Sequence, residues 1–409
     1  MKKITTTVVA FAALLIMYTT SVNAVESGTL EVHGFLSQGF VKSTRENNFP
    51  VTNSGQGSFN LNDFGINFAK ELNDDLHMGM QLFAFDRGSY GKDKITLDWA
   101  YGDYRSKDWL GFRIGKVKIP LGLYNEARDN DALRTFIFLP QQAYYDYERD
   151  SLVAIIGGGI YGSVFLGASG TLNYQLEMGS IPAIADGSFA QEIGGMISTT
   201  NANLNLSSIS SKTSIAHSLE WRTPVSGLRA LVTGLHTTLS GAATGMNMDN
   251  NGSVTADWKY DSLHRYLFSL EYTYKDLVLS SEYELDDFTL RANYSDPTLE
   301  DFSSRQESDA WSVMATYRFT DLFELGSFYH EVYADRHHRN GSTFEDFGMF
   351  APYNMWWKDS ALTLRFDPLP DMVVKLEGHR LNGTYEIIEN FDNAKKDWYI
   401  FATKVTFTF

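Results

Sequence analysis

The sequence predicts an all-β protein, a transmembrane antiparallel β-barrel of about sixteen strands. Segments in which apolar and polar residues alternate recur along the whole chain, as strands with one lipid face and one water face require. The chain is rich in aromatic residues (14%) and is still 21% charged. It contains no run of roughly 18 apolar residues that would cross a bilayer as a helix. Alternation of two opposite faces explains how a membrane protein stays hydrophilic on average.

The first 24 residues have the pattern of a secretory signal peptide. "MKKITTTVVAFAALLIMYTTSVNA" begins with two lysines, continues with an apolar run from Val8 to Met17, and ends in small residues suited to cleavage. The apolar run is too short to span a bilayer. We therefore expect residues 1–24 to be removed and residues 25–409 to form one exported barrel domain.

Charge and cysteine content exclude several classes of protein. The net charge is −16 and there is no cysteine. An acidic chain lacks the basic surface that binds nucleic acid, so we expect no nucleic-acid partner. Without cysteine there are no disulfides, thiolate metal sites or cysteine nucleophiles.

The two adjacent histidines do not indicate a metal site. His337 and His338 would point to opposite faces of a strand, so they would not share a metal ion. We expect neither a metal site nor a cofactor.

The predicted strands follow from period-two alternation. In "ALTLRFD", Leu362, Leu364 and Phe366 alternate with polar residues. Short turns and long loops alternate between the segments, as in outer-membrane barrels, and an even strand number places both termini in the periplasm. The expected strands are 29–42, 58–71, 74–86, 93–105, 109–119, 151–165, 170–180, 214–223, 227–239, 262–275, 276–288, 309–319, 322–334, 358–367, 371–382 and 397–409. The expected long loops are 43–57, 120–150, 181–213, 240–261, 289–308, 335–357 and 383–396.

The last strand explains why the chain ends in "KVTFTF". Every backbone N–H and C=O inside the bilayer must be paired, so the sheet has to close. The last strand must therefore pair with the first, "TLEVHGFLSQGF". Phe409 would then lie in the aromatic girdle at the membrane interface. A terminal phenylalanine also resembles the signal that outer-membrane proteins present to their assembly machinery.

The stretch "RIGKVKIPLGLYNEARDNDALRTFIFLPQQAYYDYERD" predicts a constriction. In large barrels one loop folds inward, and we expect the 120–150 loop to do so. Acids on the loop facing bases on the wall would create a transverse field that sorts solutes. A bulge at Gly115 would let both lysines of the wall reach the lumen. The candidate pore-lining residues are Arg113, Lys116, Lys118, Glu126, Arg128, Asp129, Asp131 and Arg134.

One further motif resembles a dinucleotide fingerprint. Gly157, Gly159 and Gly162 follow an apolar run, and Glu177 comes twenty residues after Gly157. That chemistry needs a helix N-terminus to hold the pyrophosphate. Another alternating strand follows instead, so we interpret these glycines as positions where strands bend or approach closely.

Three stretches carry a family resemblance: "GFLSQGFVKS", "RIGKVKIPLGLYNEARD" and "KVTFTF". The chain resembles the sixteen-stranded trimeric porins of Gram-negative bacteria, most of all the phosphate-selective and DcaP-like group. The resemblance implies a water-filled channel and a homotrimer in the cell outer membrane. It does not carry over phosphate specificity, because that family's arginine ladder and lysine ring have no counterpart by position here.

These observations predict a porin for passive diffusion of small hydrophilic solutes or ions through an outer membrane whose lipid surrounds it. Because the bases concentrate at 113–118, we expect a slight preference for anions. An alternative is a barrel that sheathes a protein partner such as a multihaem electron conduit, which would need a wide lumen without an inward loop. We expect no enzymatic activity, since His217 and Ser218 are strand neighbours that face opposite sides.

Overall fold

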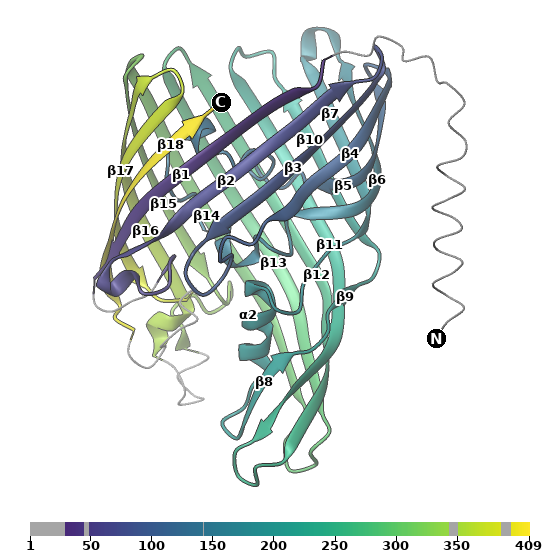
Figure 1. Cartoon of the computed structure of the whole chain (residues 1–409), viewed down its shortest axis with the longest axis vertical. Coiled ribbons are helices and arrows are strands. Elements are labelled where there is room, and N and C mark those ends of the chain that lie inside the picture. The colour runs from purple at the N-terminus through teal and green to yellow at the C-terminus, as the bar shows by residue number, and fades with distance from the viewer. Residues whose placement is uncertain (1–28, 45–48, 142, 343–350, 386–393) are drawn as a thin grey trace.

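The computed structural model describes residues 29–44, 49–141, 143–342, 351–385 and 394–409. The predicted signal peptide, residues 1–24, lies outside the described residues, as do parts of four of the expected long loops. Strands dominate the described chain (Figure 1). Among the described residues, no helix is both long enough and apolar enough to pass through a bilayer.

Sixteen antiparallel strands among the described residues close into a barrel, which confirms the predicted fold class. Each strand pairs with the next along the chain, and the last pairs with the first. The barrel strands are β1 (Glu31–Ser43), β2 (Ser58–Glu71), β3 (Leu76–Asp86), β4 (Thr96–Lys107), β5 (Leu110–Lys118), β6 (Ala154–Phe165), β7 (Thr171–Ser180), β10 (Ser214–Arg222), β11 (Leu228–Asn247), β12 (Ser253–Tyr274), β13 (Leu277–Tyr294), β14 (Phe302–Thr320), β15 (Phe323–Tyr333), β16 (Trp356–Leu369), β17 (Met372–Gly383) and β18 (Asp397–Thr408).

The closing seam forms as the sequence requires. Along it β1 and β18 run in unbroken register from Phe35↔Thr408 to Ser43↔Ile400. The backbone of Phe409 completes the seam, because its N–H and C=O each bond to Gly34 at 3.0 Å. A Cβ on Gly34 would meet the ring of Phe409, so the small residue leaves room for the terminal aromatic.

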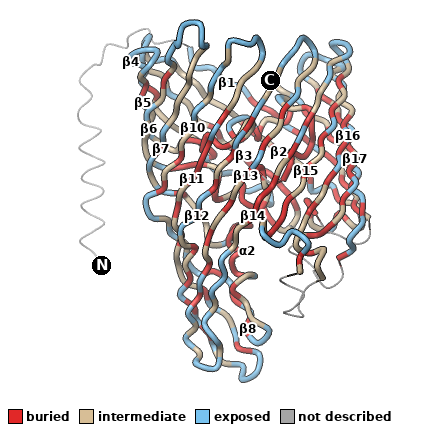
Figure 2. Tube along the Cα trace, turned by 180° about the vertical axis from the view of Figure 1, so that it is seen from behind, coloured by how far each residue is buried: buried red, intermediate tan, exposed pale blue. Residues whose placement is uncertain are grey.

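Alternation along the strands produces two different faces. On β16 and β17, Leu362 and Leu376 are exposed at 52% and 46%, whereas Thr363 and Lys375 are fully buried. In Figure 2 buried positions recur along the strands of the barrel wall. The outward face is therefore apolar and suited to lipid, and the inward face carries the polar and charged groups.

The four strands β11–β14 are longer than predicted, and the expected long loops at 240–261 and 289–308 are wrong. The β11–β12 pairing continues to Met246↔Ser253, and the β13–β14 pairing continues to Ala292↔Phe302. These strands project beyond the rest of the barrel at the long-loop end (Figure 1). Their polar outer residues suggested loops, but the alternate inner residues pack on a core.

That core continues from the β5–β6 connection, where it includes Ile119 and Leu139, into a small extension beyond the barrel. Helix α2 (Ser188–Ile197) buries Phe189, Ile193 and Ile197 against the inner face of the long strands, where Trp258 and Tyr260 also lie. Strands β8 (Ala202–Leu206) and β9 (Ser210–Ser211) pair with β11 beyond the end of β10. The 181–213 connection is thus folded, and it covers an apolar sheet face that would otherwise be exposed to water.

Candidate functional site

The connection between β5 and β6, residues 119–153, is tied to many strands of the barrel, and we call it the interior segment. Its backbone or side chains bond to inward-facing residues on opposite walls of the barrel. These wall residues are Gln81 of β3, Thr233 of β11, Glu282 of β13, Glu324 of β15, and Glu377 and Lys375 of β17. These wall side chains are buried and inward-facing. A segment bonded to opposite walls of a closed barrel lies across its interior.

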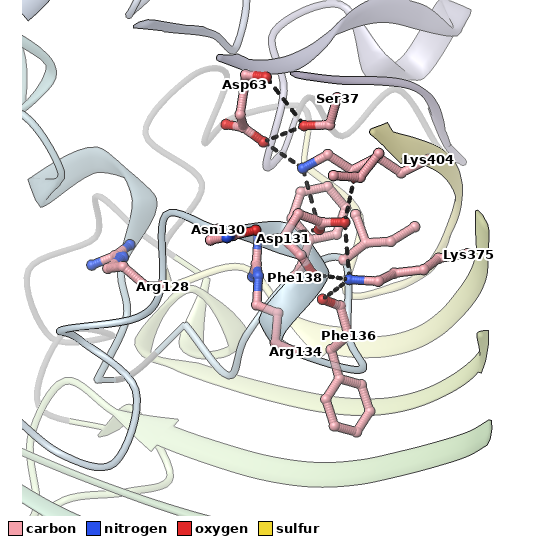
Figure 3. A network of polar contacts seen from close by, with 12 residues as sticks. Ser37, Asp63, Arg128, Asn130, Asp131, Arg134, Phe136, Phe138, Lys375 and Lys404 are labelled. Atoms are coloured by element: carbon pink, nitrogen blue, oxygen red, sulfur yellow. Dashed lines mark hydrogen bonds and ion pairs between the residues drawn. The ribbon is translucent and has the colours of Figure 1, made fainter. Parts of the chain in front are cut away.

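Asp131 is the central anchor of the interior segment. It begins the short helix η2 (Asp131–Leu133), in which the Asn130 side chain accepts a bond from the Ala132 N–H at 3.0 Å. The Asp131 carboxylate lies 2.9 Å from Nζ of Lys375 and 3.3 Å from Nζ of Lys404. Figure 3 shows both lysines reaching from the wall toward it. Burial opposes its ionisation, but the two lysines outweigh burial and hold the pKa of Asp131 well below its usual range.

The same network spans the barrel seam. Lys404 of β18 also pairs with Asp63 of β2, and Asp63 accepts a bond from Arg87 at 2.8 Å. Ser37 of β1, which lies between these two strands, donates to Asp63 at 3.4 Å. The interior segment is therefore fastened at the place where the first and last strands meet (Figure 3).

A second group of charges fastens the segment to β3, β4 and β5. Lys118 pairs with Asp98 at 3.3 Å and also with Asp129, which Arg149 contacts from the opposite side. Gln81 donates to both carboxylates, at 2.7 Å to Asp98 and 3.3 Å to Asp129. All five side chains are buried. The acids and bases of the predicted constriction thus pair with one another across the segment–wall boundary.

Two wall carboxylates bind the backbone of the interior segment. Glu377 accepts bonds from the N–H groups of Ile137 and Phe138 at 2.7 and 2.9 Å. Glu282 accepts from the Leu123 N–H at 2.9 Å and from the Tyr144 hydroxyl. Burial and the neighbouring Glu282 charge raise the pKa of Tyr144 well above its usual range, which keeps that donor protonated. Buried carboxylates of this kind fix the path of a chain that has little regular structure of its own.

Seven of the eight predicted pore-lining residues lie in three environments. Lys118, Arg128, Asp129, Asp131 and Arg134 lie in or beside the buried contacts between segment and wall. Arg113 lies on the inner wall, where its Nε donates to Asp103 at 2.7 Å and its guanidinium stacks on Tyr101 and Tyr161. Glu126 is exposed, and no ion pair to its carboxylate occurs among the described residues.

The position of Lys116 differs from the predicted one, because the expected bulge at Gly115 does not occur in the β5–β6 register. Lys116 pairs with Ile156, which is 50% exposed on the outer face, and its Nζ donates to the Leu97 carbonyl at 2.6 Å. The β5–β6 register runs unbroken through Gly115. The register instead breaks between β3 and β4, next to Asp98. The bulge turns Asp98 inward toward Lys118. Lys116 lies on the outer face because no bulge interrupts β5 between Arg113 and Lys116.

A narrow polar cavity lies between the interior segment and the wall. Its volume is about 10 Å³, close to the least space that holds one water molecule. A larger cavity of about 460 Å³ lies at the short-turn end, beside Ala132 of the segment, and Arg365 and Asp367 line part of it. The lining of the narrow cavity consists of Asp63, Arg87, Arg128, Asp129, Arg134, Leu139, Tyr144, Asp146 and Arg149.

On the short-turn side of the interior segment, wall charges occur in cross-strand pairs. Arg229 of β11 bonds to Glu220 and Glu271, each at 2.9 Å. Across the barrel, Arg318 of β14 pairs with Glu324 at 2.6 Å and Asp367 at 2.9 Å. Charges of both signs thus alternate around the inner wall.

Several anchoring residues were not predicted as site residues. Arg265 of β12 is buried, bonds to Glu148 of the interior segment at 2.9 Å, and pairs with Asp286 at 2.6 Å. Glu282 and Glu377 were likewise missed as anchors. Their only signal in the sequence is an ionisable residue at an inward position of an amphipathic strand, and that pattern does not distinguish a free lumen charge from a bonded one.

The glycine motif has a structural role. Gly159 of β6 lies directly opposite Glu177 of β7 in the strand register. A Cβ on Gly159 would collide with the Glu177 carboxylate and with the Leu176 carbonyl. The glycine and the acid of the apparent dinucleotide fingerprint therefore meet across a hairpin, and the missing side chain makes room for the carboxylate.

A Ser–His–Asp row also occurs on neighbouring strands. Ser312 of β14 lies opposite His330 of β15, which lies opposite Asp359 of β16. The three residues are 0–3% exposed, and neither ring nitrogen of His330 nor the Ser312 hydroxyl makes a hydrogen bond. Asp359 instead bonds to His379 at 2.8 Å. The row lacks both the contacts and the access that a serine nucleophile needs.

No set of three His, Cys, Asp or Glu side chains in the described parts of the chain is arranged to hold a metal ion.

No family model and no curated protein matches the sequence. Solved structures match over nearly the whole chain. The outer membrane channel DcaP of Acinetobacter baumannii is 9% identical with a TM-score of 0.53, covering 93% of this chain and 97% of that chain. The anion-selective porin from Comamonas acidovorans is 9% identical with a TM-score of 0.52, covering 93% and 99%. OmpF of Salmonella typhi, solved with daunomycin, is 13% identical with a TM-score of 0.53, covering 93% and 97%. This protein therefore has the fold of the sixteen-stranded outer-membrane porins.

Proposed function

We propose that the protein is an outer-membrane channel for passive diffusion of small hydrophilic solutes or ions. The observation that carries the proposal is a closed barrel with an apolar outer face, whose polar interior is crossed by one segment bonded to opposite walls. A water-filled barrel narrowed in this way sorts solutes by size and charge without a catalytic cycle.

The interior segment would set the width of the passage. Its buried bonds to the wall keep it from moving freely, so the passage would have a fixed, small cross-section. The cavity of about 460 Å³ at the short-turn end would form the wider vestibule on the periplasmic side.

Charge selectivity would be weak. We expected a preference for anions from the bases at 113–118, but Arg113 is paired with Asp103, and Lys118 with Asp98 and Asp129. Pairing leaves little net field from these side chains in the lumen. The exposed Glu126 carboxylate interacts electrostatically with Arg113 and Glu177 of the wall, so it would moderate any anion preference.

The proposal also covers the export, membrane orientation and oligomeric state of the channel. Residues 1–24 would act as a signal peptide, residues 25–409 would form the barrel domain, and both termini would lie in the periplasm. Phe409 would present the assembly signal at the end of the seam. We propose a homotrimer surrounded by outer-membrane lipid. A solved form of OmpT of Vibrio cholerae, 12% identical with a TM-score of 0.50 over 93% of this chain and 99% of that chain, is described as a trimer.

The sheath alternative is less well supported. A barrel that encloses a protein partner needs an open lumen, whereas here Glu282 and Glu377 hold the interior segment from opposite sides. We also propose no enzymatic activity, because Ser312 and His330 of the Ser–His–Asp row are fully buried and make no bond to each other.

The test is single-channel recording of the refolded mature protein in a planar bilayer, with the reversal potential measured under a KCl gradient. We expect small conductance steps in groups of three and a reversal potential close to zero. A folded barrel that never conducts would overturn the channel proposal. A strong shift toward either ion would overturn the proposed balance of charges.

A further inference from the structure

The charges around the narrow cavity do not balance. Ion pairs among buried or nearly buried residues connect seven cationic side chains with five carboxylates, and we call this set the cavity network. No side chain of the network is more than 14% exposed. The network therefore holds an excess of positive charge away from solvent. Its cations are Arg87, Arg128, Arg134, Arg149, Lys118, Lys375 and Lys404, and its carboxylates are Asp63, Asp98, Asp129, Asp131 and Asp146.

Several guanidinium donors in the network are unused. The Nε–H groups of Arg87, Arg134 and Arg149 are buried and make no hydrogen bond to any residue that the structure describes. All three residues line the narrow cavity. Arg87 and Arg149 are each less than one tenth exposed. A buried donor without an acceptor costs about 1–3 kcal/mol, so three such donors around one cavity indicate a missing acceptor.

The positive excess also acts on the arginines of the interior segment. Burial, followed by the nearby Arg149 charge, lowers the pKa of Arg128 to about 10. Burial lowers the pKa of Arg149 as well, although Asp98 and Asp63 oppose it. Arginine otherwise keeps its charge in proteins, so a lowered pKa marks surroundings that disfavour a positive charge. Burial also disfavours the charge of Arg87, but there Asp63 and Asp146 outweigh burial and raise its pKa. The unfavourable surroundings therefore lie on the side of the interior segment, around Arg128 and Arg149.

We propose that the narrow cavity binds a small monovalent inorganic anion of the chloride class. The anion would accept bonds from the unused guanidinium donors and offset the positive excess of the cavity network. The volume of about 10 Å³ is that of one water-sized particle. A halide is slightly larger and would enter only with a small outward movement of the lining guanidinium side chains, and polyatomic anions are excluded. Because the cavity lies between the interior segment and the β2–β3 wall, the bound anion would strengthen the attachment of the segment. The site does not depend on the channel conducting.

A neutral molecule in the narrow cavity would not offset the positive excess of the cavity network. A water molecule could accept one or two of the N–H bonds but would leave the charge excess in place. The two occupants therefore predict different responses to halide, and this difference can be measured.

The test compares the full mature chain, folded in detergent, in NaCl, NaBr and sodium gluconate at equal ionic strength. We expect chloride and bromide to raise the thermal unfolding temperature by several degrees above gluconate. Arg134→Gln should reduce this halide-specific increase by at least half, because Arg134 lines the cavity and makes one ion pair, at 3.5 Å. Arg222→Gln is the matched control, since Arg222 is 66% exposed, lies outside the cavity, and should leave the increase unchanged.

Crystals grown in NaBr give a readout that does not depend on any variant folding. We expect an anomalous bromide peak inside the cavity. Equal unfolding temperatures in chloride and gluconate, or bromide peaks at other positions with none in the cavity, would overturn the proposal. Neither measurement uses conductance. A negative result for the anion site is therefore distinguishable from a failure of the proposed channel function.

Discussion

The Asp131 carboxylate lies 2.9 Å from Nζ of Lys375, and both side chains are at most 1% exposed. Asp131 belongs to the interior segment and Lys375 to strand β17, so this one ion pair joins the segment to the wall. Lys404, on the neighbouring strand, approaches the same carboxylate at 3.3 Å. One buried carboxylate shared between two lysines therefore anchors the segment on this side of the barrel.

Replacing Asp131 with Asn should loosen the interior segment. The amide keeps the shape but removes the charge, and Lys375 then has no carboxylate in the described structure to pair with. Removing one partner of a buried ion pair costs about 3–5 kcal/mol. We expect a lower unfolding temperature by circular dichroism and larger, noisier single-channel currents.

The control for Asp131→Asn is Asp257→Asn, which changes an exposed carboxylate of β12 in the extension. It should alter neither the unfolding temperature nor the current. If Asp131→Asn behaves like this control, the carboxylate does not anchor the segment.

Gly159→Ala should destabilise the barrel by about 1–3 kcal/mol, the usual cost of overpacking. The new Cβ would meet the Leu176 backbone carbonyl as well as the Glu177 carboxylate, and the backbone group cannot move aside without disturbing the β6–β7 pairing. Urea unfolding of the refolded barrel measures the effect. Gly102→Ala on β4 is the matched control, because no atom lies within 4 Å of its added Cβ. Equal midpoints for the two variants would contradict the close approach.

Glu126→Gln should shift the reversal potential toward chloride. Glu126 is exposed on the interior segment, and its carboxylate is not consumed by an ion pair in the described structure. Its removal leaves the charge of Arg113 less opposed. We expect a shift of several millivolts under a KCl gradient with little change in conductance. Glu300→Gln, in the exposed turn after β13, should produce no shift, and an equal shift in both variants would show that Glu126 has no special position.

Stability of the extension should fall as the pH rises from about 4.5 to about 8. Burial raises the pKa of Glu192 on α2 to about 8, and the nearby Glu148 charge adds to this. Its Oε2 makes no hydrogen bond. Below the ordinary pKa, the carboxyl group is protonated in both states and costs nothing. Between the two pKa values the unfolded chain releases the proton while the folded chain retains it, so unfolding becomes easier.

Amide hydrogen exchange of residues 188–197, corrected for the intrinsic effect of pH, measures this loss. We expect weaker protection at pH 9 than at pH 5 in the natural chain. Glu192→Gln should remove most of the difference, because glutamine does not titrate. Protection that is independent of pH in the natural chain would rule out a buried, protonated Glu192.

Much of the fold could be predicted because the bilayer imposes local rules on the sequence. The predicted strand 58–71 matches β2, and the predicted strands 74–86 and 371–382 fall within about two residues of β3 and β17, since each must alternate faces at a fixed length. Phe409 pairs at the seam with Gly34, as complete backbone pairing requires. Alternation involves only neighbouring positions along a strand, and closure follows from the need to pair every backbone group inside the bilayer.

The failures of prediction involve contacts between distant positions. The loops expected at 240–261 and 289–308 are strands because α2, far away in sequence, covers their inner face. Lys116 points outward because β5 pairs with β6 without a bulge at Gly115, which leaves Lys116 on the opposite face from Arg113. The irregularity lies instead between β3 and β4, next to Asp98, and period-two alternation does not locate it.

The sequence by itself determined the barrel, its closure and the presence of a charged segment after β5, because apolar outer residues and backbone pairing act strand by strand. Only the tertiary structure decided the roles of the charges. Asp131, Lys118 and Asp129 were predicted as pore-lining charges, and the structure shows them paired at the segment–wall boundary. Their role depends on which partner lies within about 4 Å in three dimensions, and Lys375 and Lys404 come within reach of Asp131 only when the barrel has closed around the segment.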